Sequence, residues 1–290
     1  MNIVLSVGKL IQQTVTEFLN DNATQMAAAL SYYALFAIPS LLLITLSLLN
    51  LFIADEQAKM SIINLSSELF GARSAGVISQ IIQHLDENGT QSIVEQWGGI
   101  ILLLITATGI VGHLQRSLNK LWDTFPSHHN TFQLHLIQRL SSLVFIILAG
   151  ILLLIVFVSD TLLSFLNVYI SSTVGVSTSV LSIVNHLFSF IMMVLIISLI
   201  YRYVPNGKMS WKDILVGALV TTILFSIGKY LIGIYLDFST VGSVYGAAGS
   251  ILLLLIWIYY TSLIFFFGAE FTQVYANVHG SGISTSNKRI

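Results

Sequence analysis

Two ionisable side chains lie inside long apolar runs in the last third of the chain. Lys229 lies in the run from Ile214 to Leu236, and Glu270 lies in a second run from about Tyr245 to Gln273. At about 1.5 Å per helical residue, each run is long enough to cross a hydrocarbon layer of about 30 Å. A charge at that depth costs roughly 2.5–3.5 kcal/mol on insertion scales, so such a residue usually faces a cavity or a partner.

Lys229 is the side chain that we expect to attract the negative group of a substrate. It stands 18 residues after Trp211, well within the first of the two runs. The alternative is a lysine whose long stem reaches the outer surface, where Asp237 follows two turns later. The functional interpretation is favoured.

Glu270 lies near the cytoplasmic end of the second run, where cationic groups of other helices reach a similar depth. Those groups are Arg116, His113 and Arg202. We therefore expect a structural ion pair that locks the helix ends, with a proton or ion site as the alternative. Lys229 lies nearer the opposite side, so we do not expect it to pair with Glu270 directly.

Further polar side chains on several expected helices could line a path for a substrate. Anchoring at the membrane interface explains the tyrosines equally well. The candidates for the path, beside Lys229 and Glu270, are Gln25, Tyr32, Tyr33, Arg116, Asn119, Tyr235 and Tyr245.

Pro39 and several glycines are expected to shape the helices. Pro39 removes one backbone hydrogen bond in mid-helix and meets the carbonyl of Leu35, so we expect a kink there that serves as a hinge. Gly242, Gly246 and Gly249 are spaced for a close helix contact within the chain.

Hydrolytic chemistry finds little support in the sequence. Cleaving RNA needs a metal cluster or paired acid and base groups. His128, His129 and His135 are the only clustered histidines, and Asp123 is the one carboxylate near them. We interpret them as part of a solvated loop, and we expect no enzyme activity, no metal site and no cofactor.

The composition places the chain in a membrane. Of its 290 residues 55% are hydrophobic and only 9% are charged, whereas soluble domains carry about 25% charged residues. A net charge of −1 gives no footprint for nucleic acid, and the absence of cysteine excludes disulfides. The expected fold is all-α, with six transmembrane helices and amphipathic interfacial helices. The lipid bilayer is the expected partner, and assembly into a homo-oligomer stays open.

The expected organisation has three parts. Residues 1–22 form a cytoplasmic segment whose residues 3–20 read as an amphipathic helix, either on the membrane surface or packed against the bundle. Residues 277–290 form a polar cytoplasmic tail. The transmembrane domain occupies 23–276, with an external loop over 54–95 that holds two short helices broken near 71–76. Its six spans are expected near 23–53, 96–118, 136–159, 180–204, 214–236 and 245–273.

The distribution of lysine and arginine predicts the orientation. With six spans both termini share one side, and nine of the twelve cations fall on that side, against two on the other. Since cytoplasmic loops carry the excess of positive charge, both termini are expected in the cytoplasm of a bacterial cell, beneath the inner membrane. The nine are Lys9, Arg116, Lys120, Arg139, Arg202, Lys208, Lys212, Lys288 and Arg289.

Several motifs together resemble the YihY/virulence factor BrkB family. AAALSYYALFAIPSLLLI at 27–44 resembles its first-helix signature, and LQRSLNKLWD at 114–123 resembles the motif after its second helix. YRYVPNGKMSWKD, GKYLIGIYL, VYGAAGSILLLLIWIYY and FGAEFTQVYA resemble its C-terminal block in order. The resemblance implies a six-helix inner-membrane protein with cytoplasmic termini. Some members carry an old ribonuclease BN label that is regarded as a misassignment, and transport roles have been suggested.

The function that these observations favour is transport. We expect a transporter or flippase-like permease for a lipid or another anionic or amphipathic small molecule. Lys229 would attract the negative group, Pro39 would be the hinge and Glu270 would gate or lock the cytoplasmic side. The alternatives are a non-transporting scaffold that supports envelope integrity through its outer loop and, last, a ribonuclease.

Overall fold

The computed structural model describes residues 2–49, 55–70, 76, 78–83, 109–124, 178–238, 247–280 and 282–283. The regular elements within these residues are α-helices, which confirms the all-α class for this part of the chain. Two helical stretches cover 78–83 and 109–121. The longer helices are α1 (Asn2–Asn20), α2 (Ala23–Leu49), α3 (Asp55–Phe70), α7 (Thr178–Tyr203), α8 (Trp211–Phe238) and α10 (Ala247–Val278).

Three of the described helices are long and apolar enough to cross a membrane. The segments that meet this condition are His186–Tyr203, Trp211–Tyr235 and Ile251–Val278. A shorter apolar helix covers Ala23–Ile38 within α2. The predicted third span, and residues 96–108 of the second, lie outside the described residues. The count of six spans therefore stays a prediction.

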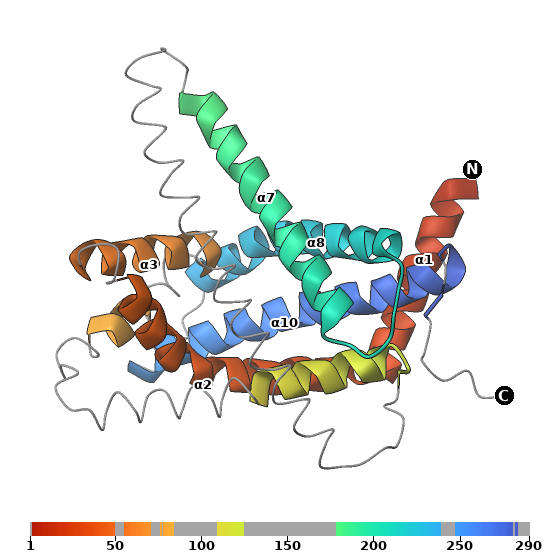
Figure 1. Cartoon of the computed structure of the whole chain (residues 1–290), viewed down its shortest axis with the longest axis horizontal. Coiled ribbons are helices and arrows are strands. Elements are labelled where there is room, and N and C mark those ends of the chain that lie inside the picture. Colours follow the sequence, from red (N-terminus) through yellow and green to blue (C-terminus); the bar gives the residue numbers. More distant parts are fainter. Residues whose placement is uncertain are drawn as a thin grey trace.

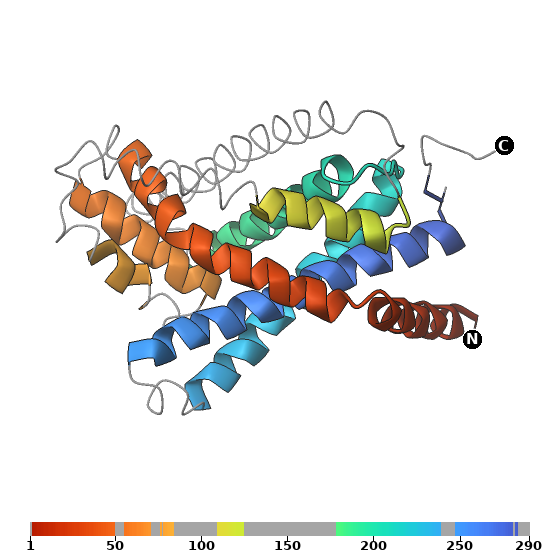
Figure 2. The ribbon, with the colours of Figure 1, turned by 90° about the horizontal axis from the view of Figure 1, so that it is seen from below.

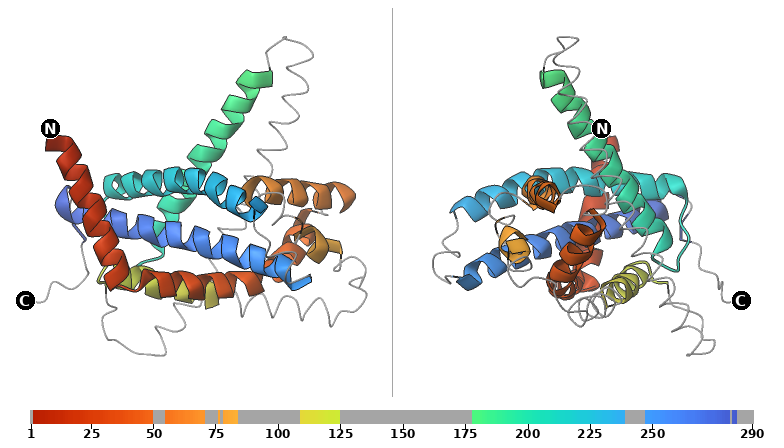
Figure 3. Two further views of the ribbon diagram at one scale, coloured as in Figure 1. Left: turned by 180° about the vertical axis from the view of Figure 1, so that it is seen from behind. Right: turned by 60° about the vertical axis from the view of Figure 1, so that its left-hand side comes forward.

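In the view of Figure 1 the helices α2, α8 and α10 all extend along the long axis of the molecule, and α10 packs against both of the others. α7 packs on α8, crosses it steeply and rises out of this group (Figures 1 and 3). α1 meets α2 at a tight turn and lies at the end of the bundle where α10 ends (Figure 2). The last turns of α10 are therefore covered by an N-terminal helix.

α2 is helical without interruption from Ala23 to Leu49, but it is not straight. Its second half, which contains Pro39, turns away from the direction of its first half (Figures 1 and 3). This course agrees with the kink expected at a proline inside a helix. A hinge role for Pro39 stays a prediction.

α8 and α10 approach each other closely because glycine on one helix faces threonine on the other. A Cβ built on Gly217 would lie 1.8 Å from Oγ1 of Thr272, and a Cβ on Gly268 would lie 1.8 Å from Oγ1 of Thr221. Each threonine hydroxyl donates to the carbonyl of the glycine four residues before it, at 2.7 Å for Thr221 and 2.6 Å for Thr272. Small residues of this kind let membrane helices pack backbone to backbone. We call these two reciprocal contacts the glycine–threonine crossing.

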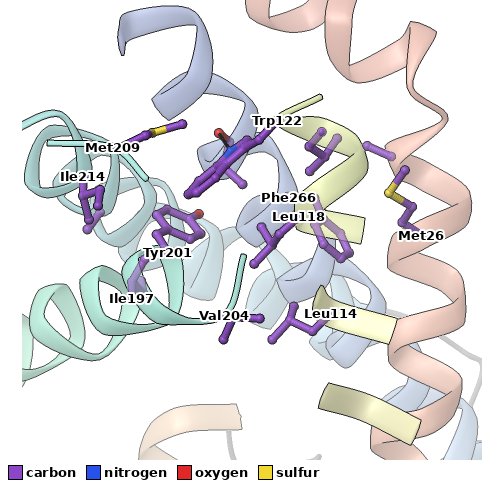
Figure 4. Close-up of a cluster of buried hydrophobic side chains, with 14 of the residues drawn as sticks. Met26, Leu114, Leu118, Trp122, Ile197, Tyr201, Val204, Met209, Ile214 and Phe266 are labelled. Carbon is purple, nitrogen blue, oxygen red and sulfur yellow. Dashed lines mark hydrogen bonds between the residues drawn. The ribbon is translucent and has the colours of Figure 1, made fainter. Parts of the chain in front are cut away.

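A buried cluster of large side chains joins the 109–124 segment to α7, α8 and α10. Trp122, Tyr201 and Phe266 are its largest members and are all at most 1% exposed (Figure 4). The rings of Trp122 and Tyr201 meet edge to face with centroids 6.2 Å apart. The Tyr201 hydroxyl donates to the Phe265 carbonyl at 2.7 Å and lies 3.1 Å from Oγ1 of Thr221. The cluster therefore braces the glycine–threonine crossing from the side.

The two predicted amphipathic regions form helices within the described residues. α1 turns Leu10 and Thr14 inward against the bundle, while Ile11, Val15 and Leu19 form an exposed stripe at four-residue spacing. It therefore packs on the bundle and still offers an apolar face of the kind that binds a membrane surface. In the loop over 54–95 that is predicted to be external, α3 and the 78–83 stretch flank the predicted break.

Candidate functional site

Glu270 is the most unusual side chain of the described bundle. It is 0% exposed, and neither of its carboxylate oxygens has a hydrogen-bond partner. Gly268 and Thr272, two residues before and two after it, face α8 in the glycine–threonine crossing. Since two residues turn a helix by about 200°, Glu270 points to the opposite face of α10. On that side lies α1: the ring of Phe267, three residues before Glu270, meets Phe18 of α1 with centroids 5.7 Å apart, and α10 also packs against α2.

The ion pair that the sequence led us to expect for Glu270 is wrong for the residues that the structure describes. Arg116 is exposed and runs back along its own helix, 3.4 Å from the Cβ position of Gly112. The ring Nε2 of His113 lies 2.9 Å from the carbonyl of Met26. The side chains of Arg116 and His113 are therefore both engaged away from Glu270.

The third expected partner, Arg202, is held by the loop that follows α7. Its guanidinium donates to the carbonyl of Met209 and lies over the ring of Trp211, 5.7 Å from the centroid. Helix rotation decided these pairings. A similar expected depth in the membrane was therefore not enough to predict which side chains pair.

Within the described part of the chain, the charged groups that act on Glu270 electrostatically are acidic. They are Glu17 near the end of α1, Asp21 at the α1–α2 turn and Asp123 after the 109–121 helix. Burial raises the pKa of Asp21, and Lys120 opposes that rise. Lys120 also donates from Nζ to the Asp21 carbonyl at 2.5 Å. The end of the bundle near Glu270 is therefore a patch of carboxylates with one lysine at its edge.

The 109–124 segment positions this patch through hydrogen bonds to several parts of the bundle. Nε1 of Trp122 donates to the carbonyl of Ala269 at 3.1 Å, directly before Glu270. Oδ1 of Asn119 accepts from the backbone N–H of Asn206 at 2.7 Å and from Oγ1 of Thr124 at 3.0 Å. Asn119 therefore has a structural role, which was not predicted from the sequence when Asn119 was named as a path residue.

Lys229 lies partly buried on α8, well away from Glu270. The glycine–threonine crossing fixes the register of the antiparallel pair, and it places the two residues about ten positions apart along α8, or about 15 Å. This confirms that they do not pair directly. The neighbouring Gly228 packs under Tyr260, whose hydroxyl would lie 2.7 Å from a Cβ there. Within the described part of the chain, Lys229 shows no ion pair or hydrogen bond.

The remaining path candidates do not gather around one point in the described structure. Tyr32 and Tyr235 are more than half exposed and Gln25 is also exposed, a placement that agrees with the interfacial alternative. Tyr33 is half buried against the ring of His113, at 5.6 Å between centroids. Tyr245 lies outside the described residues.

Sequence reasoning missed the residues that hold the helices together. The spacing Gly-x-x-x-Thr occurs once on α8 and once on α10, at Gly217–Thr221 and Gly268–Thr272, and this signal was readable. The predicted glycines Gly242 and Gly246 lie outside the described residues, as do His128, His129 and His135. No group of three histidine or acidic side chains that could hold a metal occurs among the described residues.

Comparison with known proteins identifies relatives along almost the whole chain. The family model described as virulence factor BrkB matches residues 14–289. A UPF0761 membrane protein of Pseudoalteromonas atlantica is 24% identical over 269 residues, which cover 91% of this chain and 85% of that protein.

Two further relatives carry the same name. One from Mannheimia succiniciproducens is 27% identical over 263 residues, with 89% and 86% covered. One from Legionella pneumophila is 22% identical over 275 residues, which cover 94% of this chain and 63% of that protein. These names describe membrane proteins and mention no enzyme activity. No solved structure matches the chain.

Proposed function

Because this chain belongs to the virulence factor BrkB family of membrane proteins, we propose that it is a transporter or flippase-like permease of the bacterial inner membrane. Its substrate class is anionic or amphipathic. One observation carries the proposal: Lys229 and Glu270 lie on membrane-spanning helices, and neither has an ion-pair partner among the described residues. Ionisable residues that remain in a membrane without such a partner usually mark a substrate or ion pathway.

The two residues have different roles in this proposal. Lys229 is partly buried toward the far end of α8 and supplies the positive charge that holds the anionic group. Glu270 is buried near the C-terminal end of α10, where α1 packs on α10. Their separation of about 15 Å suits two stations on one route better than a single site.

The bend in α2 supports a moving part. α2 packs along α10, and its second half departs from the line of its first half (Figure 3). A proline inside a helix leaves one carbonyl without its usual partner, so bending there breaks fewer backbone hydrogen bonds. We propose that this half of α2 moves relative to the fixed α8–α10 pair.

Transport can be tested with the purified protein in vesicles. A fluorescent short-chain phosphatidylglycerol serves as the amphipathic anion, and its movement between leaflets is followed by chemical quenching of the outer leaflet. We expect vesicles with the wild-type protein to move it faster than empty vesicles. Equal rates would favour the scaffold alternative.

Variants of Lys229 then test the assigned role. Lys229→Met keeps the apolar stem without the charge, so we expect it to abolish movement while stability is unchanged or higher. Lys229→Arg keeps the charge but changes its shape and hydration, so it should restore activity only in part. Lys212→Met is the matched control, because Lys212 is an exposed lysine on the same helix. Full activity of Lys229→Met would remove this residue from the mechanism.

A further inference from the structure

We propose that Glu270 is a proton-binding site, loaded from the α1–α2 end of the bundle through the carboxylates of Asp21, Glu17 and Asp123. Loading forms an O–H bond on one carboxylate oxygen of Glu270, and release breaks that bond and returns the proton to water at the same end. The inference rests on the proposed function where it assigns a coupling role: the proton would drive the permease.

Burial without a partner is the first argument for a proton. An ionised carboxylate taken out of water costs several kcal/mol unless a counter-charge or donors compensate it. Glu270 has no exposed surface and accepts no hydrogen bond. Protonation removes the charge and with it most of this cost. The side chain is therefore stable where it lies only while it carries a proton.

Among the residues that the structure describes, no cation acts on Glu270 in place of the proton. α2 contributes no charged side chain, and α1 with its following turn contributes Glu17 and Asp21. The 109–124 segment contributes Asp123, while its Lys120 is directed to Asp21.

The charged groups of α8 lie elsewhere. Asp213 faces Gly280 at the end of α10, at 2.4 Å from a Cβ built there. Lys212 is exposed, and Lys229 lies about 15 Å away along the helix pair. The groups that act on Glu270 are thus of its own sign, and they also favour its neutral form.

A metal ion is a poorer occupant than a proton. Ca²⁺, Mg²⁺ and transition metals need several oxygen, nitrogen or sulfur ligands at once. No three histidine or acidic side chains come together for this purpose in the described residues. A proton needs a single oxygen, which Glu270 supplies.

The neighbouring acids differ in exposure in the order that a route from water to Glu270 requires. Asp123 is exposed, Asp21 and Glu17 are half buried, and Glu270 is fully buried. The α1–α2 turn carries Asp21 beside Asn22, which adopts the left-handed conformation at φ 58°. Lys120 holds this turn through the Asp21 carbonyl. A small opening of the turn would let water reach Glu270 past these carboxylates.

Infrared spectroscopy of the reconstituted protein tests the site without any substrate. A protonated carboxyl in an apolar setting has its own C=O stretching band, and labelling with ¹³C-glutamate shifts it if the acid is a glutamate. We expect such a band in acidic and neutral buffer and its loss in alkaline buffer. Glu270→Gln should lack it, whereas the control Glu56→Gln, at an exposed glutamate of α3 outside the proposed route, should keep it.

Two outcomes would overturn the proposal. One is a wild-type protein with no protonated glutamate band in acidic buffer, and the other is a band that survives Glu270→Gln. If the glutamine variant fails to fold, Glu270→Asp keeps a carboxyl, and the band should then move from glutamate-labelled to aspartate-labelled protein; a band that stays with glutamate refutes the site.

The spectrum also separates this inference from the proposed function. Vesicles that move no lipid while the Glu270 band is present refute the permease and leave the proton site intact. Vesicles that move lipid without a Glu270 band refute the proton site and leave the permease.

Discussion

Adding one methyl group at Gly217 should push α8 and α10 apart. The Cβ of Gly217→Ala would lie 1.8 Å from Oγ1, 2.7 Å from Cβ and 2.9 Å from Cγ2 of Thr272. A new rotamer of Thr272 cannot relieve the contact, because its Cβ is fixed to the backbone. The helices must therefore separate until carbon atoms reach ordinary contact near 3.5–4.0 Å.

The expected cost follows from these distances. Overpacking of a close contact costs about 1–3 kcal/mol, and the separation also loosens the second contact between Gly268 and Thr221. Alanine regains at most about 1 kcal/mol through its higher helix propensity. We expect Gly217→Ala to lower the free energy of unfolding by about 1–3 kcal/mol overall.

The assay is thermal unfolding of the purified protein in detergent, read from the fraction that stays monodisperse after heating. Gly233→Ala is the matched control, since Gly233 lies on the same helix and a Cβ there meets nothing within 4 Å. That variant should be neutral or slightly stabilised. The exchange Gly217→Thr with Thr272→Gly places the glycine on the opposite helix, and it should restore part of the lost stability. If Gly217→Ala and Gly233→Ala have the same melting temperature, the glycine–threonine crossing does not determine stability.

Three further outcomes follow from other contacts. Pro39→Ala should lower phosphatidylglycerol movement while the melting temperature holds or rises, because the helix regains a backbone bond; unchanged movement would make Pro39 merely structural. Asn119→Ala removes the bonds of Oδ1 to the exposed N–H of Asn206 and to the part-buried hydroxyl of Thr124, so it should cost about 0.5–1.5 kcal/mol of unfolding free energy in the same melting assay, whereas Gln115→Ala, which loses one exposed contact of 3.4 Å, should be close to neutral. Burial raises the pKa of Asp21 above the ordinary 3.8, so wild-type stability should fall as pH rises through the interval above that value. Asp21→Asn should remove this fall, and parallel pH profiles of the two proteins would contradict it.

The helices were predictable because the lengths of the apolar runs in the sequence match the lengths of the helices. The predicted spans 180–204 and 214–236 correspond to Thr178–Tyr203 and Trp211–Phe238, within three residues at each end. α10 runs on to Val278, five residues beyond the predicted limit, because the polar residues near its end remain helical where α1 covers them. The membrane edge and the helix end are therefore different points.

The pairing of side chains was not predictable from the same information. Depth along each helix placed Glu270 near Arg116, His113 and Arg202, but contact depends on the rotation of each helix about its axis. That rotation is set by the glycine–threonine crossing, which turns Gly268 and Thr272 toward α8 and Glu270 away from it. A carboxylate, two arginines and a histidine at one depth thus end on different faces.

The glycine–threonine crossing also restricts which part of the molecule can expose Glu270. Gly268 and Thr272 are its neighbours at two residues on either side, and both are locked against α8, so α10 cannot turn there without breaking two close contacts. Trp122 also donates a hydrogen bond to the carbonyl of Ala269, the residue directly before Glu270. Access to Glu270 must therefore come from the elements on its other face. There, among the described residues, the α1–α2 turn is held by the donation of Lys120 to the Asp21 carbonyl, by the donation of Asn22 to the Asn20 carbonyl and by local backbone bonds. The α8–α10 pair is therefore the fixed part beside Glu270, and the proton that we propose for this residue would enter and leave at the α1–α2 turn, whereas the movement proposed for the second half of α2 concerns the other end of that helix.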